Sequence, residues 1–324
     1  MLVGLVKLLS PTSIKATRAR VGGVPIGGVM LPRPRARALV PYLFLFPFFA
    51  VDAVFLLYPV ISALYLSFFD ATGLGARKFI GLGNYAALVR DPRYLRALVH
   101  TTQYALGSIF LLSPLALLIA LAVRSFIVPS QSLKSFYRLA YFLPQLTSFV
   151  VIALMFALVF DKDYGLLNNF LAGIGLPRLA WLRSSELAMP SIILVGIWTF
   201  VGINSLYFLA GLQGIPEEVN EAAAIDGATR RQILWHVTLP LLRPTILFVL
   251  VQATIFSYQL FDLPFLLTEG GPSDASLTVV IYLYQVGFRQ FQLGYASAIG
   301  YSLAIISILL STMQLWLFRR WSEP

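Results

Sequence analysis

Two apolar segments of the chain, residues 187–212 and 241–263, carry polar and aromatic side chains at helical spacing. The residues that share a face by i, i+4 and i+7 spacing are Phe200, Asn204 and Tyr207 in the first segment, and Gln252, Phe256 and Gln259, with Ser257 adjacent, in the second. Aromatic rings can stack on the C–H faces of a sugar, while amide and hydroxyl groups can hydrogen-bond its hydroxyls. These two faces therefore predict a path for a carbohydrate. The alternative for any single residue is helix packing, which is the commoner use of Asn, Gln and Ser inside a membrane.

A second group of chemically active residues lies in Glu217–Pro240, where four carboxylates, two arginines and a histidine interrupt an otherwise apolar region. Pro216 suits the first turn of a helix, and the glutamates after it complement the positive helix end. Gly227 is expected to end this helix, because glycine tolerates a left-handed cap. A second short helix is predicted from Thr229 to Val237, closed by the Leu-Pro pair that follows. The segment is predicted to form a compact knob in water.

The elements that must position these residues are membrane helices. The chain is 58% hydrophobic and 12% charged, and its mean hydropathy is +0.81. These values predict an all-α, polytopic membrane helix bundle. A span needs about 20 mostly apolar residues, and six windows qualify, namely 41–69, 98–123, 136–160, 187–212, 241–263 and 297–318. The connection 264–296 contains an apolar stretch, which we expect to lie as an interfacial helix along the membrane face.

Lysine and arginine counts predict the orientation. If both termini lie inside, the inner segments hold 15 basic residues and the outer connections hold 9. Seven of the inner ones precede Val40 with no acidic residue among them, which is typical of a juxtamembrane flank and argues against a nucleic-acid surface. We therefore expect a basic cytoplasmic segment at 1–38, a transmembrane domain at 39–324 and a cytoplasmic loop at about 213–240. Met30 is an alternative translation start to Met1.

The charged segment also resembles a known family motif. Glu221-Ala222-Ala223, three residues, Gly227, nine residues and Val237-Thr238-Leu239-Pro240 are similar to the EAA motif of ABC importer permeases, with Val237 in place of isoleucine. Further similar blocks, in the order of MalF-type sugar permeases, are GLGNYAAL at 81–88, YGLLNNFL at 164–171, LAGLQGIPEE at 209–218 and FDLPFLLTEGGP at 261–272.

This resemblance implies a bacterial inner-membrane permease subunit with an ABC importer fold. The ATPase-coupling residues that it implies are Glu221, Ala222, Ala223, Asp226, Gly227, Leu239 and Pro240. Its expected partners are a second permease subunit in a heterodimer, two ATP-binding subunits and an extracytoplasmic solute-binding protein. ATP and Mg²⁺ are expected in the ATP-binding subunits, and no cofactor, metal or catalytic residue is expected in this chain.

The residue types also exclude several chemistries. The sequence contains no GxxxxGK[ST] loop, no GxSxG elbow, no HExxH helix and no cysteine, so we do not expect an enzyme. No lysine or arginine occupies the middle of a span, which favours a neutral mono- or oligosaccharide as the cargo. A permease for glycerol phosphate or an acidic oligosaccharide is the alternative. An ion-coupled secondary transporter is more remote, because it predicts paired intramembrane carboxylates and repeat symmetry; a membrane scaffold is the third option.

Overall fold

The computed structural model describes residues 35–73, 75, 77–124 and 143–322. The part described is mostly helical, with one two-stranded antiparallel sheet that the sequence did not predict. The expected boundary near residue 38 is not tested by it, and the first 34 residues, including Met1 and Met30, lie outside the described residues. Residues up to Pro59 and residues from Val60 onward form two units.

The first unit contains α1 (Arg35–Asp52) and the π-helical turn η2 (Ala53–Leu57). The helix continues as α2 (Tyr58–Ser67), so that Leu43–Ser67 is long and apolar enough to cross a membrane. This span agrees with the first predicted window.

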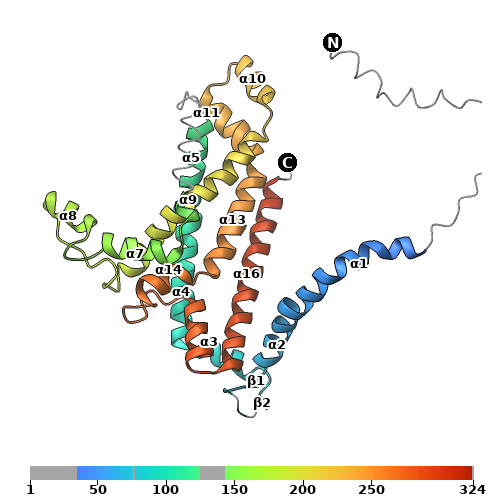
Figure 1. Cartoon of the computed structure of the whole chain (residues 1–324). Coiled ribbons are helices and arrows are strands. Elements are labelled where there is room, and N and C mark those ends of the chain that lie inside the picture. Colours follow the sequence, from blue (N-terminus) through green and yellow to red (C-terminus); the bar gives the residue numbers. More distant parts are fainter. Residues whose placement is uncertain (1–34, 74, 76, 125–142, 323–324) are drawn as a thin grey trace, which may run out of the picture. The chain divides into compact units, whose positions relative to one another are not determined.

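After the end of α2, the second unit continues with the hairpin β1 (Phe69–Asp70) and β2 (Lys78–Phe79). The helices that follow are α3 (Gly83–Arg90), α4 (Pro92–Gly107), η3 (Ser108–Leu112), α5 (Ser113–Arg124), α7 (Phe149–Val159), α8 (Leu166–Gly173), α9 (Ala188–Gln213), α10 (Glu217–Ile225), α11 (Arg230–Ile233), η4 (Leu234–Thr238), α12 (Leu239–Leu241), α13 (Arg243–Tyr258), α14 (Asp262–Thr268), α15 (Val279–Tyr284), η5 (Gln285–Arg289) and α16 (Leu293–Ser322). In this unit α13 and α16 run side by side, with α10 and α11 near one end and α3 near the other (Figure 1).

Four helices in the described part of the chain could span a membrane by length and composition, and a bent pair raises the number to five. Besides the first span, they are Pro92–Arg124, Ala188–Gln213 and Leu293–Arg319, with the pair Arg230–Leu241 and Arg243–Tyr258. The third predicted window, 136–160, is represented by α7, which is a shorter apolar helix; its residues before 143 lie outside the described part.

The helices pack through small residues and a few polar bonds. Ala116 and Ala120 of α5 are buried against α9, where Phe208 and Leu212 belong to the same apolar cluster. Close approach of backbones at small side chains is a main source of helix association in lipid. At the end of α5, Arg124 Nη1 donates a hydrogen bond to Leu212 O at 2.6 Å, which satisfies a carbonyl in the last turn of α9.

The expectation of an interfacial helix within 264–296 is wrong. Val279, Ile281 and Val286 of the helix formed by α15 and η5 are almost completely buried, in one cluster with residues of α4 and α16. Gln285 and Arg289, the polar residues that interrupt this apolar stretch, pair with Arg93 and Glu269. This segment is therefore part of the protein core.

Candidate functional site

A cavity of about 420 Å³ lies between α9, α13 and the segments around them. All seven residues that the sequence placed on the two polar faces line it, namely Phe200, Asn204, Tyr207, Gln252, Phe256, Ser257 and Gln259. The two faces converge because helical spacing puts each set on one side of its helix and the two helices pack together. The volume falls within the range of small-molecule sites, about 300–1,000 Å³.

The α9 wall combines an amide with aromatic rings. Asn204 is 8% exposed, and its Nδ2 donates to the carbonyl oxygen of Phe200 at 2.9 Å. That bond uses one of the two amide N–H groups. The Phe200 ring lies 6.0 Å from the ring of Phe149, measured between centroids. This wall thus presents apolar ring surface beside an amide that is already held in place.

The α13 wall is connected to α9 by a hydrogen bond. Gln252 Nε2 donates to the Tyr207 hydroxyl oxygen at 3.2 Å, so part of the polar capacity of both residues serves helix packing. Gln252 Oε1 is buried and has no hydrogen-bond partner among the described residues. Phe256 and Gln259 are exposed in the isolated chain, whereas Ser257 is 2% exposed. The wall therefore contains both fixed and free polar groups.

Sequence reasoning missed several lining residues. Tyr104 and Ser108 come from the second span, where i, i+4 spacing could have revealed them. Gln145 belongs to a short helical stretch before α7, and Asp262 begins α14. Asp262 is the single carboxylate among the described lining residues, which include neither lysine nor arginine. The cavity can therefore stack and hydrogen-bond a hydroxylated ligand but offers no cation to an anionic one.

The second predicted site, the loop around Gly227, forms two short helices as expected. Gly227 has a φ of +83°, and its N–H donates to Ala224 O at 3.1 Å, while the N–H of Ala228 donates to Ala223 O at 3.0 Å. This pair of bonds is a Schellman cap, which ends α10 at a left-handed glycine. The side chain of Gln232 and that of Thr229 then form a capping box at the start of α11.

The predicted coupling residues lie on α10, on the exposed turn after it and on the helix that follows. Glu221, Ala222, Asp226 and Gly227 are exposed, Ala223 is partly buried, and α10 contributes no buried residue. Ile225 is 86% exposed, which leaves its apolar side chain open to a partner.

The expected end of the second helix at Leu239-Pro240 is wrong. The helix continues through both residues to Leu241 and bends by 63° before Arg243. Pro244, in the first turn of α13, explains the position of the bend, because its ring clashes with the carbonyl four residues earlier. Leu242, at the bend, is fully buried beside Leu212 and Val249. The exposed turn is therefore connected at both ends to helices that line the cavity.

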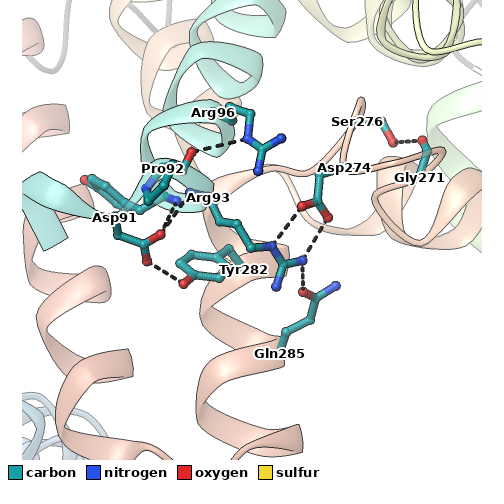
Figure 2. A network of polar contacts seen from close by, with 10 residues as sticks. Asp91, Pro92, Arg93, Arg96, Gly271, Asp274, Ser276, Tyr282 and Gln285 are labelled. Carbon is teal, nitrogen blue, oxygen red and sulfur yellow. Dashed lines mark hydrogen bonds and ion pairs between the residues drawn. The ribbon is translucent and has the colours of Figure 1, made fainter. Parts of the chain in front are cut away.

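At the start of α4, a polar network joins residues far apart in the sequence (Figure 2). Arg93 donates from Nε and Nη2 to the two carboxylate oxygens of Asp274, at 2.8 Å each, and from Nη2 to Gln285 Oε1 at 3.1 Å. The Arg93 guanidinium also lies over the Tyr282 ring. These bonds attach the loop after α14 to the start of α4.

Asp91 forms the other half of this network. Its carboxylate caps α4 by accepting from the backbone N–H groups of Arg93 and Tyr94, and it also accepts from the hydroxyls of Tyr282 and Tyr295. Burial raises the pKa of the Asp91 carboxyl, but these four hydrogen bonds outweigh burial and hold the pKa below its ordinary value. The hydrogen bonds from Arg93 likewise lower the pKa of Asp274. Both carboxylates are therefore charged at neutral pH.

Comparisons with known proteins agree with this arrangement. A family model described as "Binding-protein-dependent transport system inner membrane component" matches residues 113–323. The arabinooligosaccharides transport system permease protein AraP of Bacillus subtilis is 36% identical over 86% of this chain and 88% of its own length. The lactose transport system permease protein LacF of Rhizobium radiobacter is 33% identical over 86% of this chain and 93% of its own length.

A solved structure extends the likeness to three dimensions. A chain of a bacterial alginate ABC transporter, in complex with an alginate pentasaccharide-bound periplasmic protein, superposes with a TM-score of 0.79 at 25% identity. The match covers 89% of this chain and 96% of that chain.

Proposed function

The chain belongs to the family of binding-protein-dependent transport system inner membrane components, and we propose that it is the permease through which a carbohydrate ABC importer moves its substrate. The observation that carries this proposal is the cavity, which gathers seven aromatic, amide and hydroxyl residues from two spans. Relatives whose names specify arabinooligosaccharide and lactose transport support a carbohydrate cargo. The chain is a transport subunit and not itself an enzyme.

Within this class, a neutral mono- or oligosaccharide is the proposed cargo. The described lining residues offer hydrogen-bonding groups and ring faces, but their one charged member is the carboxylate of Asp262. A carboxylate repels uronates and phosphates, which usually require arginine or lysine. The likeness to an alginate transporter favours the alternative of an acidic oligosaccharide, and a permease for glycerol phosphate is the other anionic candidate. Sugar-loaded binding proteins of both charge classes would distinguish these cargoes.

The proposed complex has two permeases, two ATP-binding subunits and an extracytoplasmic binding protein. ATP and Mg²⁺ would be held by the ATP-binding subunits. Six spans with both termini in the cytoplasm place α10 and α11 inside, where they can dock on an ATP-binding subunit. The exposed face of α10 supports this role, since Ile225 offers apolar contact and Glu221 and Asp226 offer carboxylates to basic partner residues.

The proposed mechanism is a change of cavity access driven by that docking. Closure of the two ATP-binding subunits displaces α10 and the helix Arg230–Leu241. Because this helix joins α13 at a buried bend, its displacement changes the orientation of the wall that carries Gln252 and Gln259. The cavity then alternates between inward and outward exposure, a two-state equilibrium biased by another subunit.

The test is to recover the complex by pulling down this chain and to measure its ATPase activity with a panel of sugar-loaded binding proteins. We expect ATP-binding subunits to co-purify and one neutral sugar to stimulate hydrolysis. If no ATPase co-purifies under gentle conditions, and the purified chain alone transports a sugar down an ion gradient, the ion-coupled alternative replaces this proposal.

A further inference from the structure

A second cavity, of about 640 Å³, lies on the side of α7 and α14, apart from the polar cavity. Its apolar wall includes Leu154 and Leu158, which lie four residues apart on α7 and are 64% and 74% exposed. Lys162 and Arg183 also line it, and we call this charged part its rim. The cavity therefore changes from hydrocarbon to positive charge over a few residues, at the point where an apolar helix ends.

Buried hydrogen bonds hold this rim together. Asn168 is fully buried, and its Nδ2 donates to the carbonyl oxygens of Asp161, Lys162 and Leu179, at 2.8–3.1 Å. Its Oδ1 accepts from the N–H of Leu179 and from the indole N–H of Trp181. Because one amide joins the turn at Lys162 to the segment that leads to Arg183, the backbone positions of the two cations are fixed before any ligand binds.

The floor of the cavity is aromatic. The Trp181 ring stacks on Phe160 with a centroid separation of 5.7 Å. Tryptophan concentrates where membrane hydrocarbon meets the headgroups, which agrees with the position of this cavity at the end of α7. Since the indole N–H is already bonded to Asn168, the ring contributes only apolar surface to a ligand.

The rim also contains one negative group, Asp161. Its Oδ1 accepts from the backbone N–H groups of Tyr164 and Asp163, both at 2.9 Å, and these bonds lower the pKa of the carboxyl. Asp161 is therefore charged at neutral pH, and the rim has two positive charges against one negative charge. A ligand with a single negative charge and an apolar tail fits this surface best.

We propose that this cavity binds an anionic phospholipid, with its phosphate between Lys162 and Arg183 and its acyl chains along Leu154 and Leu158. Charge complementarity and the adjoining exposed apolar wall both favour a lipid over a free anion, which would leave the hydrocarbon wall uncovered. In the proposed orientation, the lipid comes from the outer leaflet. Its role is to fill the surface beside α14, the helix whose first residues line the transport cavity.

The experiment uses the complete complex in nanodiscs of phosphatidylcholine and phosphatidylglycerol. The complex is released from the nanodiscs, and native mass spectrometry counts the phosphatidylglycerol molecules that stay bound to it. Each cation is worth about a fivefold change in occupancy, following the typical contribution of a basic residue near an anionic membrane surface. Lys162→Gln and Arg183→Gln should each lower retention about fivefold, and the double variant about 30-fold. Lys78→Gln, which removes an exposed cation on β2, should leave retention unchanged.

Asp161→Asn gives an independent result in the opposite direction. The amide oxygen can still accept from the backbone, while the negative charge is lost, so retention should increase. Unchanged phosphatidylglycerol retention in both the double variant and Asp161→Asn would overturn the proposal. Displacement of the lipid by inorganic phosphate would identify a free-anion site instead. Because the chain has no cysteine, Leu158→Cys can be cross-linked specifically, and a cross-link to the second permease would show that protein covers the cavity.

Discussion

Replacing Gly227 by alanine should weaken the docking of ATP-binding subunits without unfolding the spans. The residue has a φ of +83°, and a Cβ built on it would meet no atom within 4 Å. The cost of the substitution is therefore backbone strain, about 1–2 kcal/mol for an L-residue in the left-handed region. If docking requires the native cap of α10, the dissociation constant of the ATP-binding subunits should increase about 5–30-fold.

The chain provides a matched control at Gly175. This glycine has a φ of +79° and no neighbour within 4 Å of a built Cβ. Its N–H donates to Ala172 O, and the N–H of Leu176 donates to Leu171 O, so that it ends α8 with the same cap. Gly175→Ala therefore imposes the same local strain at a site far along the chain from the coupling segment.

The assay is titration of ATP-binding subunits onto the permease complex in nanodiscs, together with sugar-stimulated ATPase activity. Gly227→Ala should weaken binding, and Gly227→Pro should do so more strongly, because proline also removes the N–H that bonds to Ala224. Gly227→Asn should be milder, since asparagine tolerates the left-handed region better. Equal effects of Gly227→Ala and Gly175→Ala, or normal binding in Gly227→Pro, would refute the assignment of this turn to coupling.

Three further outcomes are expected. Asn204→Ala should lower the affinity for the transported sugar about 5–10-fold, the typical value of one lost hydrogen bond, while complex assembly measured by size-exclusion chromatography stays normal. Gly196→Ala should destabilise the protein by about 1–3 kcal/mol, seen as a lower unfolding temperature, because the new Cβ would lie 2.2 Å from the Tyr104 hydroxyl. Arg93→Gln should destabilise it by about 0.5–1 kcal/mol at neutral pH, since the pair with Asp274 is partly exposed. The pKa of that carboxyl is lowered, so the pair stabilises the fold fully above about pH 4 and less as the pH falls further.

Controls separate these effects from general damage. Gly173→Ala, where a Cβ would meet nothing within 4 Å, should leave the unfolding temperature unchanged or higher. Arg96→Gln removes a neighbouring exposed cation but leaves the pair of Arg93 and Asp274, so this variant should keep the pH dependence of stability that Arg93→Gln loses. Unchanged affinity for every sugar tested in Asn204→Ala would assign that residue to helix packing alone.

The parts of the site that could be predicted from the sequence are those in which the residues share one face or one end of a single helix. The face of Phe200, Asn204 and Tyr207 follows from helical spacing, and so does the facing set on α13. Gly227 could be identified as a cap because glycine at the end of a short helix has few other uses. These features are local, and local geometry is fixed by neighbours in the sequence.

The features that sequence reasoning missed depend on contacts between distant segments. The hydrogen bond between Arg93 and Asp274 joins residues 181 positions apart, and no local pattern identifies such a pair. The connection 264–296 was expected to contain an interfacial helix because of its apolar stretch, yet that stretch packs against α4 and α16, and Gln285 pairs with the distant Arg93. The bend before Arg243 required a choice between Pro240 and Pro244: the helix Arg230–Leu241 continues through Pro240, whereas Pro244 lies in the first turn of α13, directly after the bend.

The buried bend at Leu242 also has a mechanical consequence. The twelve residues of Arg230–Leu241 form a rigid arm about 18 Å long, at about 1.5 Å per residue. If Leu242 serves as the fulcrum, a displacement of about 3 Å at the free end turns the arm by about 10°, given that length. A small displacement at the membrane surface thus becomes a rotation at the inner end of α13. Any residue inserted into the helix Arg230–Leu241 would change the angle that a given displacement produces.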